Sequence, residues 1–176
     1  MKIVACLLGA LLSAAPAAAQ QSASVRLAPG DAAVVRIDAG TVSADVQRGA
    51  ARWTPLDIAA ARHLSGQAPI DVPATTADPM PSEGMPTPPP IEPGEIRMRL
   101  HDIAGQHTVL IIENGYGRAL VFHARMSRGD RSAATDVCLV MPNNRSFEHW
   151  PHPIDSLELT RLVQVDWRQG DPVPCR

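Results

Sequence analysis

The segment Ile96–His101, which reads Ile-Arg-Met-Arg-Leu-His, decides the fold class of this chain. Its apolar and polar side chains alternate, which is the pattern of a β-strand with one buried face. The run Val109–Ile112 is continuously apolar and lies between Gly105 and Asn114. Such a run predicts a strand that is covered on both faces. Both patterns indicate a β-domain in this part of the chain.

Residues 95–176 as a whole predict about six or seven short strands with turn signals between them. Asn114–Gly117 is typical of a hairpin turn, because its two glycines can adopt positive φ. The chain turns again at Ser127–Asp130 and breaks at Pro142–Asn144. This spacing favours a mainly β fold, an immunoglobulin-like antiparallel β-sandwich.

Residues 20–68 predict a small strand and helix element ahead of the sandwich. Val25–Leu27, Val34–Ile37 and Val42–Val46 have strand character and are separated by turn signals. A segment of this length with few large apolar side chains cannot build much of a core. We therefore expect it either to dock on the sandwich or to be loosely held.

The clearest local signature is Thr54–Ile58, which reads Thr-Pro-Leu-Asp-Ile. Threonine fits the N-cap and proline fits the first helical position. Asp57 is at the third position, where its carboxylate can reach back to the cap amide. The helix is expected over residues 55–65, and Gly66 fits its C-terminal stop. The spacing predicts one shared apolar face, made of Leu56, Ala60, Ala61 and Leu64.

Two further segments are expected to lie outside the folded domain. Residues 1–19 have the charged start, the apolar stretch and the Ala-Ala-Ala cleavage site of a secretory signal peptide. Cleavage before Gln20 would place the mature chain in the periplasm or outside the cell. Residues 69–94 contain nine prolines, a composition that favours an extended linker over a folded unit.

Charge and hydropathy argue against two classes of partner. The formal net charge is −2 at pH 7, and it becomes more negative by one when Lys2 leaves with the signal. This near balance, with no basic cluster, argues against nucleic acid as a partner. No apolar stretch after the signal is long enough to span a bilayer, so no transmembrane segment is expected there.

Cys138 and Cys175 are the two cysteines that remain once the signal has been removed. In an oxidising compartment, two cysteines most simply form one disulfide. A redox pair is more often spaced as Cys-x-x-Cys. We therefore expect a structural Cys138–Cys175 bridge, which would hold the end of the chain against the sandwich.

The densest group of potential metal ligands contains His149 and His152, with Glu148 before them and Asp155 after them. Zinc binds imidazole nitrogen and takes four ligands, three of them from the protein in catalytic sites. The neighbouring prolines exclude a regular helix, so both rings would have to bind from an extended corner. The competing interpretation is that the histidines face solvent while Trp150 packs in the core. A zinc-binding protein or a metal-dependent hydrolase centred on His149 and His152 is the alternative function.

Other catalytic chemistry has little support in the sequence. No serine lies in a Gly-x-Ser-x-Gly setting. Gly115–Gly117 lacks the strand-to-helix context of a phosphate loop. No catalytic residue is therefore assigned. A binding role is considered for Tyr116, the aromatic residue expected in a turn, and for Glu148.

Three motifs resemble a family of proteins. They are Glu113–Tyr116 with Arg118–Val121, then Thr135–Cys138, and then Phe147–Ile154. They resemble an uncharacterised family of secreted or periplasmic bacterial β-sandwich proteins with a Thr-x-Val-Cys strand and a Phe-Glu-x-Trp-Pro-x-Pro-Ile corner. The resemblance implies the compartment, a disulfide and the sandwich, and it implies no catalytic residues.

The sequence favours a non-enzymatic binding or accessory module of the cell envelope. A sandwich presents loops for binding, a proline-rich linker gives reach, and no convincing catalytic set is present. An envelope protein is the expected partner. No cofactor is expected unless the zinc alternative holds.

Overall fold

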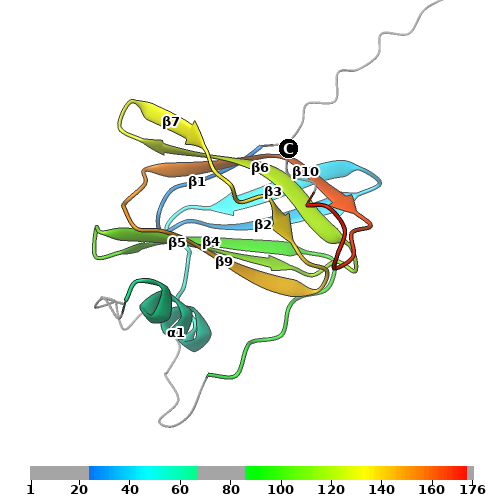
Figure 1. Cartoon of the computed structure of the whole chain (residues 1–176), viewed down its shortest axis with the longest axis horizontal. Coiled ribbons are helices and arrows are strands. Elements are labelled where there is room, and N and C mark those ends of the chain that lie inside the picture. The colour runs from blue at the N-terminus through cyan, green and yellow to red at the C-terminus, as the bar shows by residue number, and fades with distance from the viewer. Residues whose placement is uncertain (1–23, 67–85, 174–176) are drawn as a thin grey trace, which may run out of the picture.

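The computed structural model describes residues 24–66 and 86–173, and in them two antiparallel sheets pack face to face (Figure 1). Sheet A is formed by β1 (Val25–Leu27), β10 (Ser156–Val165), β6 (Ala119–Arg128) and β7 (Arg131–Ala134), with β8 (Leu139–Val140) also paired to β6. Sheet B has the order β3 (Thr41–Gln47), β2 (Ala32–Asp38), β4 (Ile96–Ile103), β5 (His107–Asn114) and β9 (Asn144–Trp150). The predicted mainly β sandwich is confirmed. The expected signal peptide and much of the expected linker lie outside the described residues.

Strands from both sides of the linker build the sandwich. β1 pairs with β10 in sheet A, and β2 pairs with β4 in sheet B. Val25, Leu27 and Val35 are fully buried in the core between the sheets. The segment 24–47 thus contributes strands to both sheets, whereas the sequence suggested a small element ahead of the sandwich.

β5 is covered on both faces, as its apolar run predicts. Leu110 and Ile112 point into the core between the sheets. Val109 and Ile111 point to the outer face of sheet B and join a second apolar cluster with residues of the helical segment. All four side chains are fully buried, so β5 contributes to both apolar clusters, one on each face of sheet B.

The segment Asn114–Gly117 differs from its prediction. β5 belongs to sheet B and β6 to sheet A, so this segment crosses between the sheets and the hairpin prediction is wrong. The buried Asn114 side chain holds the crossing, because its Nδ2 donates to the carbonyls of Arg118 at 2.8 Å and Met141 at 3.0 Å. Gly115 is needed for close approach, since a Cβ there would lie 1.8 Å from the Glu92 carbonyl oxygen.

The helix α1 (Pro55–Leu64) begins as predicted. The Asp57 N–H donates to Thr54 Oγ1 at 3.2 Å, and the Thr54 N–H donates to Asp57 Oδ2 at 3.1 Å, which completes a capping box. Of the predicted apolar face, only Ala61 is buried, together with Asp57 and Ile58, whereas Leu56 is half-buried. α1 lies against the outer face of sheet B, away from sheet A (Figure 1). No helix among the described residues is long and apolar enough to cross a membrane.

Candidate functional site

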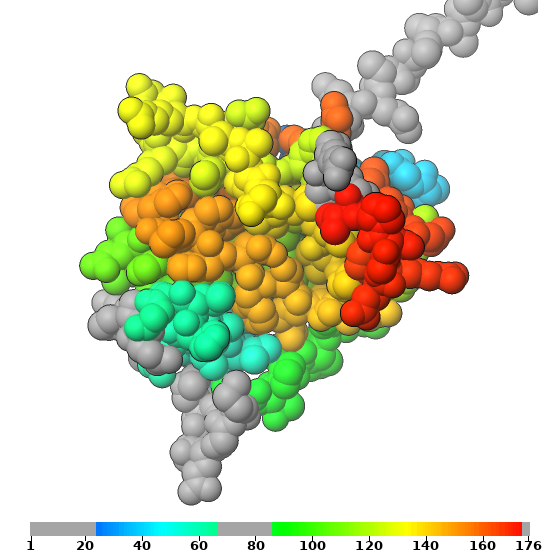
Figure 2. Space-filling view, in the orientation of Figure 1, coloured from blue at the N-terminus to red at the C-terminus, as the bar shows by residue number. Residues whose placement is uncertain are grey.

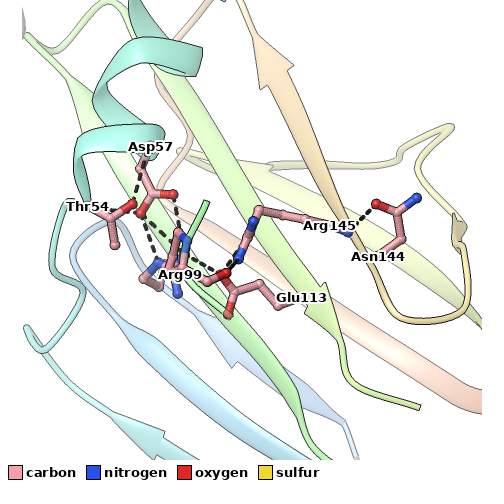
Figure 3. A network of polar contacts seen from close by, with 7 residues as sticks. Thr54, Asp57, Arg99, Glu113, Asn144 and Arg145 are labelled. Carbon is pink, nitrogen blue, oxygen red and sulfur yellow. Dashed lines mark hydrogen bonds and ion pairs between the residues drawn. The ribbon is translucent and has the colours of Figure 1, made fainter. Parts of the chain in front are cut away.

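A buried ionic network fastens α1 to the outer face of sheet B (Figure 3). Arg99 of β4 donates from Nε and Nη2 to the two carboxylate oxygens of Asp57, at 3.2 and 3.3 Å. Its Nη2 also donates to Glu113 Oε1 of β5 at 3.0 Å. Arg145 of β9 completes the series with a 2.8 Å bond from its Nε to the same Glu113 oxygen. The network therefore joins one helix to three neighbouring strands.

The charges in this network compensate one another. Burial alone would raise the pKa of Glu113, but hydrogen bonds and charge from Arg99 and Arg145 outweigh it and lower that pKa. Burial would lower the pKa of Arg99, and the two carboxylates raise it instead. Arg145 Nη2 also donates to the Pro89 carbonyl at 3.0 Å. The network positions α1 and the chain near Pro89, and it presents no unpaired charge for catalysis.

An aromatic pair next to the network closes the same face. Trp53 stacks on His101 of β4 with ring centroids 3.9 Å apart. Both side chains are buried, and His101 Nε2 has no hydrogen-bond partner among the described residues. Burial and the nearby Arg99 charge lower the pKa of His101 to about 3, so this ring is neutral at physiological pH. α1 and Trp53 thus cover the outer face of sheet B over β4, β5 and β9.

The two histidines of the predicted metal site have different neighbours. His149 lies on β9, where its Nε2 is 3.0 Å from Nδ1 of His107 on β5. His152 lies beyond the end of β9, with its Nδ1 3.2 Å from the Pro153 carbonyl oxygen. Within residues 24–66 and 86–173, no three His, Cys, Asp or Glu side chains gather as metal ligands would. The structure therefore brings His149 together with His107, a partner that the sequence did not suggest.

The two residues considered for binding have internal partners. Tyr116 is half-buried against the core, and its hydroxyl oxygen accepts a 2.8 Å hydrogen bond from the Ile37 N–H of β2. Glu148 is half-buried on β9 and accepts a hydrogen bond from the Ser146 hydroxyl. Tyr116 therefore helps to hold the crossing between the sheets, and a binding role for either residue stays a prediction.

Cys138 lies just before β8, and its carbonyl accepts a 3.1 Å hydrogen bond from the Phe122 N–H of β6. Cys175 lies outside the described residues, so the Cys138–Cys175 pairing stays a prediction. The backbone bond to Phe122 places Cys138 beside the central strand of sheet A. A bridge from this position would fix the end of the chain to the sandwich.

A hollow of about 410 Å³ lies under the β6–β7 hairpin. Figure 2 shows this yellow hairpin projecting from the molecule above the orange segment that follows β9. We call the hollow the hairpin groove. Its lining consists of Met126, Arg128, Arg131, Ser132, Ala133 and His152.

The walls of the hairpin groove are held together by hydrogen bonds. The Asp155 N–H donates to the Ser127 carbonyl at 2.8 Å, and the Gly129 N–H donates to Asp155 Oδ2 at 2.6 Å. On the other wall, Thr108 Oγ1 of β5 donates to the His152 carbonyl at 3.3 Å. These contacts tie the hairpin to the corner after β9, so the groove exists before any ligand binds.

The groove has an unusual charge arrangement. Arg128 and Arg131 stand directly opposite each other across the hairpin, and like charges in such a pair repel. None of the ion pairs formed among the described residues involves either arginine. Ser127–Asp130 contains the turn that the sequence predicts. Two arginines flanking a two-residue Gly-Asp turn were the signal that could have predicted this pair.

Comparisons of the chain with protein-family models, with curated proteins and with solved structures give no match. The resemblance drawn from the sequence motifs therefore stays an expectation. The hairpin groove is the candidate binding site.

Proposed function

We propose that this protein is a non-enzymatic binding or accessory module of the cell envelope, that it works in the periplasm or outside the cell, and that it binds an envelope protein through the hairpin groove. The signal-like residues 1–19 and the proline-rich linker motivate the location and the reach. The observation that carries the binding role is that Arg128 and Arg131 line a preformed groove and form no ion pair with any residue that the structure describes.

The contrast between the two sides of the molecule supports this assignment. Over β4, β5 and β9, the outer face of sheet B is covered by α1 and by a network whose charges pair with one another. The hairpin carries its charges without such partners, and all four residues of β7 are exposed. Two facing guanidiniums that form no ion pair with any described residue cost stability unless another molecule pairs with them.

Site-specific photo-crosslinking in the native host tests the proposal. A photoreactive residue at Ser132, in the groove, is expected to capture one envelope protein reproducibly. The matched control places the same group at His63, an exposed residue of α1, where no such product is expected. Absence of a product at Ser132, or equal products at both positions, would contradict the proposal.

A second candidate is metal binding at His149, and one distance favours it. His107 Nδ1 and His149 Nε2 lie 3.0 Å apart. Two imidazole nitrogens bound to one tetrahedral zinc ion are separated by roughly 3.3 Å. The two nitrogens therefore lie at nearly the distance that binding to one zinc ion needs. The competing interpretation is a hydrogen bond between the two rings, which gives the same distance.

Metal content of the purified protein separates these interpretations. If zinc binds, His107→Ala and His149→Ala are each expected to remove it. His152→Ala serves as the control, because the His152 ring lies in the hairpin groove. Protein with no bound zinc after dialysis against the ion would remove the metal candidate. Loss of zinc in both His149→Ala and His152→Ala, with zinc retained in His107→Ala, would favour a site made by His149 and His152.

A further inference from the structure

The hairpin groove combines a cationic rim with an apolar inner part. Arg128 and Arg131 face each other near the turn, and the next pair on the same side of the hairpin is Met126 with Ala133. Met126 is half-buried and packs against the core between the sheets. The groove therefore runs from the edge of the hydrophobic core outward to two guanidinium groups.

Acidic side chains near the groove do not neutralise the rim. No residue of the lining is acidic. Asp155 accepts a hydrogen bond from the Gly129 N–H, and Asp130 is exposed at the turn. Neither carboxylate belongs to an ion pair among the described residues. The two guanidiniums keep their donors available, and guanidinium is the side-chain group best shaped for a carboxylate or phosphate.

We infer that the hairpin groove binds a small amphiphilic anion, with its oxyanion between Arg128 and Arg131 and its apolar part against Met126 and Ala133. The inference rests on the proposed binding role of the same groove, and it adds a small-molecule ligand beside the envelope protein. A hollow of about 410 Å³ has the size of a small-molecule site. An oxyanion placed between the arginines would also remove their mutual repulsion, so binding and hairpin stability are coupled.

Three matched probes test this chemistry in the purified full chain by NMR titration. Octanoate carries both parts of the expected ligand, 1-octanol lacks the charge, and acetate lacks the apolar chain. Octanoate is expected to shift the Met126 methyl signal and the Arg128 and Arg131 Nε–H signals saturably, and to bind at least roughly tenfold more tightly than either other probe. Equal binding of octanol and octanoate, or shifts that map away from the groove, would overturn the inference.

Substitutions distinguish recognition from a structural effect. Arg128→Gln and Arg131→Gln are each expected to weaken octanoate binding by roughly tenfold, with a melting temperature that is unchanged or higher because like charges no longer face each other. Arg52→Gln, at an exposed arginine outside the groove, is the control and should bind as the parent does. Unchanged octanoate affinity in both groove variants would overturn the inference.

A parallel experiment with vesicles distinguishes two sources of the anion, a lipid headgroup and a free amphiphile. Flotation with vesicles of phosphatidylglycerol and phosphatidylcholine that depends on Arg128 and Arg131 would assign the anion to a lipid headgroup. Octanoate binding without flotation would assign it to a free amphiphile. Crosslinking from Ser132 to an envelope protein without octanoate binding would leave the proposed function standing and reject this ligand chemistry.

Discussion

Arg99 of β4 holds Asp57 of α1 through two hydrogen bonds of 3.2 and 3.3 Å, in a position where the Asp57 side chain is 1% exposed. The same carboxylate caps its own helix at Thr54. One side chain therefore both starts the helix and docks it, which explains why the buried face of α1 runs through Asp57.

Asp57→Ala is expected to destabilise the protein by about 3 kcal/mol, because it removes the cap and leaves Arg99 buried beside a single carboxylate. Urea unfolding measures this loss. The double variant Asp57→Leu/Arg99→Met should recover part of the stability, because it removes the carboxylate and the guanidinium together. If the double variant loses as much stability as Asp57→Leu and Arg99→Met lose in sum, the two residues are not coupled.

Gly115→Ala is expected to lower the free energy of unfolding by more than about 2 kcal/mol. The added methyl group would lie 1.8 Å from the Glu92 oxygen and 2.8 Å from the Glu95 oxygen, both of them backbone atoms. Gly117→Ala is the matched control, because a Cβ there meets nothing within 4 Å. Equal stabilities of the two variants would contradict the close approach seen at Gly115.

Stability is expected to decrease as the pH falls below about 6.5. The folded state keeps His101 neutral down to a pKa of about 3, whereas an unfolded chain binds a proton there from about pH 6.5. The unfolded state thus binds more protons, and stability is lost at about 1.4 kcal/mol per pH unit in this window. His149 acts in the same direction, because burial and His107 lower its pKa.

His101→Phe tests this pH dependence, because phenylalanine keeps the stacking on Trp53 and removes the titrating group. Its stability should vary less between pH 7 and pH 5 than that of the parent. Burial raises the pKa of Asp31, but hydrogen bonds from the backbone of Ala28 and Gly49 and from Arg48 lower it overall. The pKa of Glu113 is also lowered, by its arginine partners against burial, so both carboxylates lose their contribution to stability at more acidic pH. An unchanged slope in His101→Phe would assign the effect to other groups.

A Cys138–Cys175 disulfide is expected to contribute roughly 4 kcal/mol by closing a loop of about 38 residues. Thiol titration of the denatured, unreduced mature protein should find no free thiol. Cys138→Ser and Cys175→Ser should lower the melting temperature by the same amount. Two free thiols in the parent would show that the bridge does not form.

Much of the fold could be predicted from local patterns. The alternation of Ile96–His101 and the apolar run Val109–Ile112 identified the two central strands of sheet B, and Thr54–Ile58 identified the helix start. The Asn114–Gly117 turn could not be predicted correctly, because a hairpin and a crossing between sheets use the same turn residues. Which one forms depends on distant carbonyls such as that of Met141.

The sequence by itself determined the strands, the capped helix and the β class, because periodicity and capping act between residues a few positions apart. Only the tertiary structure decided that Asp57, Arg99, Glu113 and Arg145 share one network. It also paired His149 with His107 and set the β6–β7 hairpin opposite His152 to form the groove. These contacts join residues far apart in the chain, and their energies depend on which faces the packed sheets bury and which they leave open.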